Sequence, residues 1–495
     1  MQKTTVAIHK DYSIGKVEDR VFSSFVEHMG SCVYNGLYQP GHPEAEAGGF
    51  RRDVLRLVRA LRLPALRYPG GNYTSGYNWE DSVGENRPTR LDLAWKQTEP
   101  NTFGLHEFAK WQREAQAGDM IMTVNLGTRG ADDARNLLEY CNHPGGSLYS
   151  DLRRRHGLEK PLGIRTWCLG NELDATWQIC HKTPEEYGRL AAETARLMRR
   201  YDKNLELVAV GSSHNRMPTF PEWDRKVLME CYEDVDFIAL HKYVSHEGAD
   251  TPTYLAAALE MEEQIKTIAA AADYVKSVKR SRKTMKLAFD EWNVTAWDSD
   301  SPPPEEEWQI GPDRAKKTYT MEDALAFASM MLTLIRNADR VQMACQAILI
   351  NVLPMIFTDK NGGCCATTLY YPFLHGSLYG RGTALQCLTQ TPLYDCGPYE
   401  GVPTLDTAAV HDPESGAVTL FAVNRGPQRQ EVELKLEGFG AFQTLQHIAM
   451  NAPLHRVNTP ASPLACVPRE QAMPLGDSLS IPVEGYSWNV IRVLP

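Results

Sequence analysis

Two glutamates, each placed after a short apolar run, are the residues of this sequence best suited to chemistry. Residues 163–169 form one run, followed by Asn171 and Glu172, and residues 286–289 form another, with Glu291 close behind it. A carboxylate beside a buried strand is costly without partners or a task, and barrels of parallel strands carry their catalytic groups at the carboxyl ends. Glycoside hydrolysis needs one carboxyl group to protonate the leaving oxygen and another to attack the sugar or activate water. The pattern predicts a glycosidase, with ion pairs on a barrel rim as the alternative.

Strands must position these glutamates, and eight short apolar runs with mostly helical patterns between them occur before residue 348. The expected strands cover residues 21–26, 64–68, 120–125, 163–169, 206–211, 235–241, 286–289 and 341–347. The helical patterns cover residues 51–62, 105–116, 132–141, 184–201, 253–280 and 321–337. Strands that alternate with helices in this way predict an α/β protein built on a (β/α)8 TIM barrel.

The pattern changes after about residue 385, where long helical patterns stop. Short alternating runs separated by turn residues follow, such as residues 418–423. They predict a C-terminal antiparallel β-sandwich, jelly-roll-like in type, which a strand at the N-terminus joins. The expected domains are the N-terminal strand in residues 1–17, a catalytic barrel in 18–384 and the sandwich in 385–495.

The composition argues against several classes of protein. A formal charge of −10 over 495 residues disfavours a nucleic-acid partner, and no apolar run approaches the ~20 residues of a membrane span. The first residues lack the apolar core of a secretory signal, and eleven scattered cysteines without C-x-x-C fit reduced thiols, so we expect a cytoplasmic protein. The fourteen histidines show no metal-ligand spacing, so we expect no catalytic metal and no other cofactor.

Nine segments match one known family of proteins, two of them around the two glutamates: residues 167–172, 289–294, 24–28, 67–72, 76–81, 91–95, 240–243, 408–411 and 421–425. In these segments the sequence resembles glycoside hydrolase family 51. They span nearly the whole chain in order, which makes chance matching a poor explanation. The resemblance implies a (β/α)8 barrel and the activity that prevails in that family, the retaining hydrolysis of α-L-arabinofuranosides.

The resemblance also implies a role for each matching residue. Glu172 would be the general acid/base and Glu291 the nucleophile. Arg67 would lie beneath the nucleophile and Tyr243 would hydrogen-bond it, since a cation and a donor lower the pKa of a carboxyl group, whereas an acid/base needs a higher one. The other expected substrate-binding residues, which would hold sugar hydroxyls or wall the pocket, are Glu27, Asn72, Trp95, Asn171 and Trp297.

Ordinary structural explanations exist for most of these residues. Arg67 could form an ordinary structural ion pair, such as any barrel contains, and Asn72, which follows two glycines, could be a turn residue. Trp95 could pack in the core instead of contacting a sugar. Tyr243 could be a satisfied polar group of the core, and for His241, two residues earlier, that explanation is the preferred one.

Two positions depart from the family's usual pattern. Thr295 stands where the family usually has a tryptophan that walls the pocket, and Trp297 follows two residues later, in an acidic loop expected over residues 296–318. Ile348 stands where the family usually has a glutamine, three residues before Asn351. A roomier and less polar pocket would follow, and such a pocket would admit a β-D-galactofuranoside.

The sequence therefore predicts a cytoplasmic, retaining, exo-acting α-L-arabinofuranosidase that removes terminal furanosyl residues from oligosaccharides by double displacement. The resemblance implies a homo-oligomer, often a hexamer in enzymes of this kind. The rival predictions are a β-D-galactofuranosidase, an endo-acting glucanase or xylanase, and a carbohydrate-binding protein without catalysis.

Overall fold

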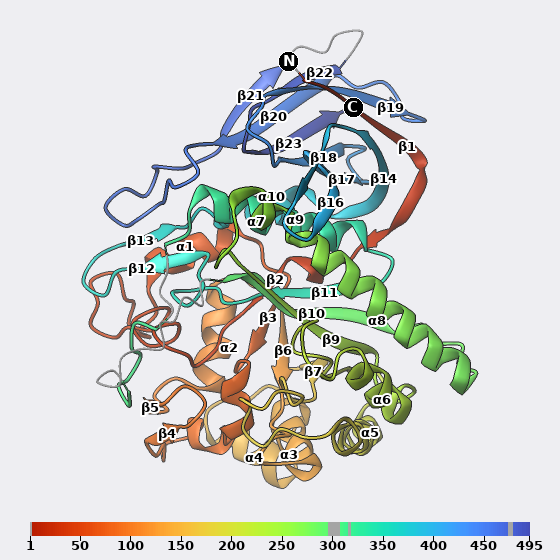
Figure 1. The fold of residues 1–495 in the computed structure, drawn as a ribbon. Helices are drawn as coiled ribbons and strands as arrows, with labels where there is room; N and C mark the ends of the chain where they lie inside the picture. The colour runs from red at the N-terminus through yellow and green to blue at the C-terminus, as the bar shows by residue number, and fades with distance from the viewer. Residues whose placement is uncertain (1, 296–306, 315–317, 474–478) are drawn as a thin grey trace.

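The chain forms a closed barrel with a mostly antiparallel sheet domain packed against it (Figure 1). The computed structural model describes residues 2–295, 307–314, 318–473 and 479–495. Both ends of the chain lie in the sheet domain, on the side away from the barrel (Figure 1). Within the described residues, no helix has the length and the apolar character that a bilayer crossing requires.

Eight parallel strands close the barrel in the order β10-β11-β2-β3-β6-β7-β8-β9. Their bounds are β2 (Ser23–Phe25), β3 (Ala65–Tyr68), β6 (Asp119–Thr123), β7 (Thr166–Cys168), β8 (Glu206–Ala209), β9 (Phe237–Ser245), β10 (Lys286–Thr295) and β11 (Val341–Gln346). All eight fall within or overlap the runs expected from the sequence, so the predicted TIM barrel is confirmed.

Helices surround the barrel strands. Their bounds are α1 (Arg52–Ala60), α2 (Leu105–Glu114), α3 (Ala131–Asn142), α4 (Leu148–Arg155), α5 (Pro184–Tyr201), α6 (Glu222–Cys231), α7 (Thr251–Ala256), α8 (Ala258–Lys279), α9 (Met321–Arg336) and α10 (Tyr370–Tyr379). The sequence patterns do not predict α4, α6 and α10. The single helix expected over residues 253–280 is wrong: the Asp250 side chain accepts the Thr253 N–H and starts a separate short helix, α7, before α8.

Short elements complete the description of the secondary structure. Single turns of 3-10 helix are η1 (Asp19–Phe22), η2 (Asn72–Gly76) and η3 (Trp79–Ser82). Two-stranded antiparallel pairs are β4 (Arg90–Asp92) with β5 (Gln97–Glu99), β12 (Ile356–Thr358) with β13 (Cys364–Ala366), and β15 (Leu393–Cys396) with β16 (Tyr399–Pro403).

The second domain is a sheet of nine strands in the order β21-β20-β23-β18-β17-β14-β1-β19-β22. Their bounds are β1 (Gln2–Val17), β14 (Gly382–Gln390), β17 (Leu405–His411), β18 (Val418–Asn424), β19 (Gln430–Glu437), β20 (Thr444–Asn451), β21 (Arg469–Met473), β22 (Leu479–Val483) and β23 (Ser487–Leu494). Leu445 and Ile481 come from opposite ends of this order but belong to one buried apolar cluster, so the sheet curls over itself as a sandwich does.

The N-terminal strand joins this sheet, as the sequence predicts, between β14 and β19. Its pairing with β19 is parallel, from Gln2 opposite Gln430 to His9 opposite Glu437, whereas the other described pairings of this sheet are antiparallel, as the sequence predicts. A strand that arrives from the far end of the chain needs no tight hairpin, so either direction is open to it. The domain limits at residues 17 and 384 stay a prediction.

Helix α9 connects the two domains, because its side chains are buried almost all round. Apolar side chains from the sheet, among them Phe421 and Trp488, belong to the same buried cluster as the barrel core. At the end of the helix, Arg336 Nη1 donates to Asp406 Oδ1 at 2.8 Å, and Arg425 Nη2 donates to Asp406 Oδ2 at 2.6 Å. A shared apolar core and the ion pair between Arg336 and Asp406 fix the sheet domain against the barrel, and Arg425 holds Asp406 in place from within the sheet domain.

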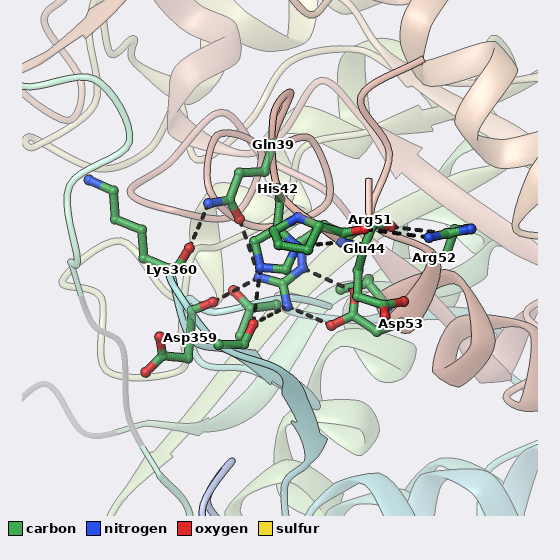
Figure 2. Close-up of polar contacts among 12 residues, drawn as sticks. Gln39, His42, Glu44, Arg51, Arg52, Asp53, Asp359 and Lys360 are labelled. Carbon is green, nitrogen blue, oxygen red and sulfur yellow. Dashed lines mark hydrogen bonds and ion pairs between the residues drawn. The ribbon is translucent and has the colours of Figure 1, made fainter. Parts of the chain in front are cut away.

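A buried arginine, Arg51, fastens the loop after the first barrel strand to the loop between β12 and β13 (Figure 2). Its guanidinium donates to both carboxylate oxygens of Asp53 and to the carbonyl oxygens of Asp359, at 2.8 Å, and of Gly362, at 3.0 Å. Gln39 adds a hydrogen bond from Nε2 to the Lys360 carbonyl at 2.7 Å. This network holds the C-terminal end of the loop that follows β2 and contains Glu27.

Replacing Arg51 by Ala should destabilise the protein by about 3–5 kcal/mol, because the buried Asp53 carboxylate loses its partner. The neighbouring Arg52 is exposed and reaches only the carbonyls of Glu44 and Pro43 at 3.3 and 3.4 Å, so Arg52→Ala is a matched control, expected within about 0.5 kcal/mol of wild type. Urea denaturation followed by tryptophan fluorescence compares the two. Equal losses would contradict the role given to Arg51.

Candidate active site

Strand β10 carries two consecutive acidic residues into the barrel. The strand does not stop at Phe289, as the sequence analysis expects, but continues to Thr295, and its register with β9 shifts between Ala288 and Glu291. Side chains of a regular strand alternate between faces, and a register irregularity re-aims them. Asp290 and Glu291 therefore both reach the same guanidinium, that of Arg67.

The second carboxylate, Glu172, lies in the turn that follows β7. Gly170 has a φ of 105° and Glu172 a φ of 47°, a conformation uncommon for a residue with a side chain. Glu172 Oε2 accepts a hydrogen bond from Trp177 Nε1 at 2.8 Å, and Oε1 lies 3.0 Å from His241 Nδ1. This turn directs Glu172 across the mouth of the barrel toward Glu291. A carboxylate oxygen of Glu172 lies within 4.8 Å of a carboxylate oxygen of Glu291.

Arg67 joins three barrel strands beneath these carboxylates. Its fully buried guanidinium lies 2.9 Å from Glu291 Oε1 and 3.2 Å from Asp290 Oδ2, and Nη2 donates to Asn171 Oδ1 at 2.7 Å. On the other side of the nucleophile candidate, Tyr243 OH donates to Glu291 Oε2 at 2.8 Å. The expected contacts of Arg67 and Tyr243 with Glu291 are both present.

Two glycines let the loop after β3 pass close to the acidic residues. Gly70 has a φ of 147°, and a Cβ there would lie 2.4 Å from the Cγ of Glu27. A Cβ on Gly71 would lie 2.6 Å from Glu291 Oε1. The next side chain, Asn72, accepts from Asn171 Nδ2 at 2.9 Å, so it belongs to the site and not merely to a turn.

Glu27 and Trp95 form the opposite part of the wall. Glu27 Oε1 accepts from the Tyr73 N–H and from Trp95 Nε1, both at 3.0 Å. Next to Glu27, His28 Nδ1 lies 2.8 Å from Glu99 Oε2 at the end of β5, which fixes the β4–β5 loop that carries Trp95. Trp95 thus both packs against Glu27 and faces the cleft.

A cleft of about 780 Å³ opens over these residues. Asn72, Trp95, Glu172, Tyr243 and Thr295 all line it, so the position where the family pattern has a tryptophan wall does face the cleft. Trp297 lies outside the described residues, as does most of the expected acidic loop. Ile348 is buried at the end of β11 and does not line this cleft.

Sequence reasoning misses three residues of this site. His241 is not merely a polar group of the core: it lies between the carboxylates, with Nδ1 3.0 Å from Glu172 and 3.5 Å from Glu291, and Nε2 3.2 Å from Asp290. The signal that could have found it is its spacing of two from Tyr243, which puts both side chains on one face of β9. Asp290 and Trp177 become recognisable only from the register shift and from the turn.

The charges do not divide between the two glutamates as the sequence analysis expects. Burial raises the pKa of Glu291, and the charges of His241 and Arg67 oppose this shift without cancelling it. Burial also acts to raise the pKa of Glu172, but the hydrogen bond and the charge of His241 outweigh it and lower the value. Glu172 accepts hydrogen bonds from His241 and Trp177, whereas the charges of Glu172 and Asp290 add to burial in raising the pKa of Glu291.

His241 itself is held in its protonated form. Burial alone would lower its pKa, but the charges of Glu291 and Asp290 and the hydrogen bonds with Asp290 and Glu172 raise the pKa well above its ordinary value. Among the described residues, Glu172, His241 and Glu291 gather donor atoms closely enough to hold a metal ion. Each of these atoms already has a partner within the protein, and the expectation that no metal takes part stays a prediction.

The raised pKa of Glu27 predicts a measurable pH dependence of the free energy of unfolding. Burial, followed by the charge of Glu291, raises the pKa of Glu27 from 4.5 to about 8, so between these pH values the folded state binds a proton that the unfolded state has lost. Stability must therefore fall as pH rises through this range, by at most about 1.4 kcal/mol per pH unit.

Replacing Glu27 by Gln keeps an oxygen for Tyr73 N–H and Trp95 Nε1 but removes the ionisation. The free energy of unfolding of this variant, relative to wild type, should rise between pH 5 and pH 8. The exposed Glu414→Gln is the control and should show a constant difference from wild type. A constant difference for Glu27→Gln as well would exclude a protonated Glu27.

Comparison with known proteins agrees with this fold and shows the family. The family model described as "α-L-arabinofuranosidase 1 domain" matches residues 57–266, and the one described as "α-L-arabinofuranosidase C-terminal domain" matches residues 290–487. The intracellular exo-α-(1→5)-L-arabinofuranosidase 1 of Bacillus subtilis is 46% identical over 100% of this chain and 99% of its own. The corresponding enzyme of Halalkalibacterium halodurans is also 46% identical, over 99% of this chain and 98% of its own.

A solved structure shows the same architecture over the full length. The family 51 α-L-arabinofuranosidase from Bifidobacterium longum superposes with a TM-score of 0.95 at 36% identity and covers 100% of both chains. Identity of this extent along the whole chain, together with the barrel, the sheet domain and the paired carboxylates, makes this protein a member of glycoside hydrolase family 51, the α-L-arabinofuranosidases.

Proposed function

We propose that this protein is a retaining, exo-acting α-L-arabinofuranosidase that releases terminal arabinofuranosyl residues from oligosaccharides. The observation that carries the proposal is the approach of Glu172 and Glu291 to within 4.8 Å. Retaining glycosidases place their two carboxyl groups roughly 5–5.5 Å apart, whereas inverting enzymes keep roughly 6.5–9.5 Å for a water molecule. The relatives named exo-arabinofuranosidases support the substrate and the exo action.

In the first half of the reaction, Glu291 attacks the anomeric carbon while Glu172 protonates the leaving oxygen. Arg67 and Tyr243 hold the two oxygens of Glu291 and fix its line of attack. Glu172 must carry a proton at this stage, and its Oε1 lies 3.0 Å from His241 Nδ1, the nearest ring nitrogen of the site. Once Glu291 bonds the sugar, its negative charge is gone, so the two carboxylates no longer repel each other.

In the second half, Glu172 acts as a base on water, which attacks the sugar bound to Glu291 and releases arabinose with net retention. Glu27, Asn72 and Asn171 lie around Glu291 as hydrogen-bonding groups for the sugar hydroxyls. The proton on Glu27 lets this carboxyl group donate as well as accept, which suits a neutral hydroxyl.

The substrate test uses arabino-oligosaccharides and two nitrophenyl furanosides. Arabinose should be the only sugar released at early times, and the α-L-arabinofuranoside should be cleaved far faster than the β-D-galactofuranoside. Glu291→Ala is the matched inactive control. Release of longer oligosaccharides would favour an endo-acting enzyme, and faster cleavage of the galactofuranoside would favour the roomier pocket that Thr295 suggests.

The same assay separates the roles of the two glutamates. Glu172→Ala should keep bond cleavage for substrates with good leaving groups, which need no acid, and azide should restore its rate by attacking the sugar bound to Glu291. Glu291→Ala should lose turnover and should not form the glycosyl azide of retained configuration, because no sugar bound to Glu291 exists for azide to attack. Equal and unrescued losses in both variants would contradict these assignments.

The relatives at 46% identity are named intracellular, which supports a cytoplasmic location for this chain. We also propose that the chain forms a homo-oligomer, on the family resemblance alone, with the hexamer as the expected form. Light scattering coupled to size exclusion should return six chains of 55.6 kDa. The mass of a single chain would rule out the oligomer.

A further inference from the structure

The lining of the cleft extends over many residues besides Glu172. Trp177 and His214, whose rings stack with centroids 6.0 Å apart, both belong to it. A further part of the lining, called the distal part below, comes from the loop after β8, from β9, α7 and α8, and from the hairpin β15–β16 of the sheet domain: Asn215, Arg216, Lys242, Thr253, Tyr254, Glu260, Pro398 and Tyr399. A volume of about 780 Å³ lies in the upper part of the roughly 300–1,000 Å³ range of small-molecule sites, enough for more than one sugar ring.

Glu260 on α8 is the centre of a polar cluster in this distal part of the cleft. Its Oε2 accepts from Lys242 Nζ at 2.7 Å, and its Oε1 accepts from Arg216 Nη2 at 2.7 Å and from Tyr399 OH at 3.0 Å. Lys242 also donates to Asn215 Oδ1 at 2.9 Å. Lys242 and Arg216, by their charges and hydrogen bonds, lower the pKa of Glu260 to about 2, so the group stays ionised.

The sheet domain holds Tyr399 in this position. The hairpin β15–β16 packs on α7, and its β16 arm lies beside the barrel helices in Figure 1. Tyr394 OH donates to the Pro252 carbonyl at 3.4 Å, and Cys396 and Val402 pack on Ala256. At the tip of the hairpin, Gly397 is so close to α7 that a Cβ would lie 2.8 Å from the Thr253 side chain.

This cluster retains hydrogen-bonding capacity toward the cleft. A guanidinium has five N–H donors and an ammonium three. Within the described residues, the side chain of Arg216 donates to Glu260 and that of Lys242 to Glu260 and Asn215. The side chain of Arg216 is 74% exposed, so its remaining donors are open to a ligand.

The position of Glu172 decides which part of the substrate reaches this region. A general acid contacts the leaving oxygen, so the leaving sugar lies on the Glu172 side of the cleft. We propose that Tyr399, Arg216, Lys242 and Glu260 form a distal subsite that binds hydroxyls of the leaving oligosaccharide, beyond the sugar next to the broken bond. The proposal rests on the proposed function. It gives the sheet domain a part in the choice of substrate.

The test compares a substrate that reaches this subsite with one that does not. α-1,5-linked arabinotetraose extends along the cleft, whereas nitrophenyl α-L-arabinofuranoside has a short leaving group. Tyr399→Phe and Arg216→Ala should each lower kcat/KM on the tetraose by about fivefold, as expected for one hydrogen bond of about 1 kcal/mol. The loss should lie in KM, and the nitrophenyl substrate should change less than about twofold.

Two matched controls separate substrate binding from structural effects. Tyr394→Phe removes a hydroxyl of the same hairpin that bonds a carbonyl of the barrel and does not line the cleft, and Arg225→Ala removes an arginine that pairs with Glu222 on α6. Both controls should match wild type on both substrates. A similar loss on both substrates in Tyr399→Phe and Tyr394→Phe would show that the hairpin only docks the domains.

Unchanged kinetics of Tyr399→Phe and Arg216→Ala on the tetraose would overturn the subsite while leaving the proposed function intact. A wild-type protein that cleaves neither substrate would instead overturn the proposed function, and with it the subsite. A loss confined to the tetraose and to the two cluster variants supports the proposal.

Discussion

The ion pairs of Arg67 with Asp290 and Glu291 are the constraint on which the rest of the site depends. A buried guanidinium needs charged partners, because removing it from water without them is prohibitive. Arg67 obtains them from a single strand, which is possible because the register of β10 shifts between Ala288 and Glu291. Its hydrogen bond to Asn171 fixes the turn that carries Glu172. Three strands of the barrel are thereby aligned at the point where the bond is broken.

Electrostatics within this arrangement are set by His241 as much as by Arg67. Protonated His241 lies against Glu172, Glu291 and Asp290, and its position lowers the pKa of Glu172 while burial raises that of Glu291. The proposed roles need the reverse division of charge in the first step, a protonated Glu172 and an ionised Glu291. Substrate binding must therefore change the surroundings of these groups before the reaction begins.

The sheet domain is more than a support for the barrel. It shares a buried core with the barrel through α9 and anchors that helix by the ion pair between Asp406 and Arg336. From this fixed position its hairpin extends Tyr399 to the cleft. Since the same contacts that hold the domains together also place that side chain, domain packing and the shape of the leaving-group region depend on each other.

The sequence by itself determined the eight barrel strands, the second domain and the two glutamates, because short apolar runs, alternating patterns and matching motifs are local in the chain. It also identified Arg67, Asn72, Asn171 and Tyr243, since each belongs to such a motif. Tertiary structure alone decided the place of His241, the inward turn of Asp290 and the contact between Tyr399 and Glu260. These depend on strand register, backbone conformation and domain packing, which bring residues together across 139 positions in the last case and leave no periodic signal in the sequence.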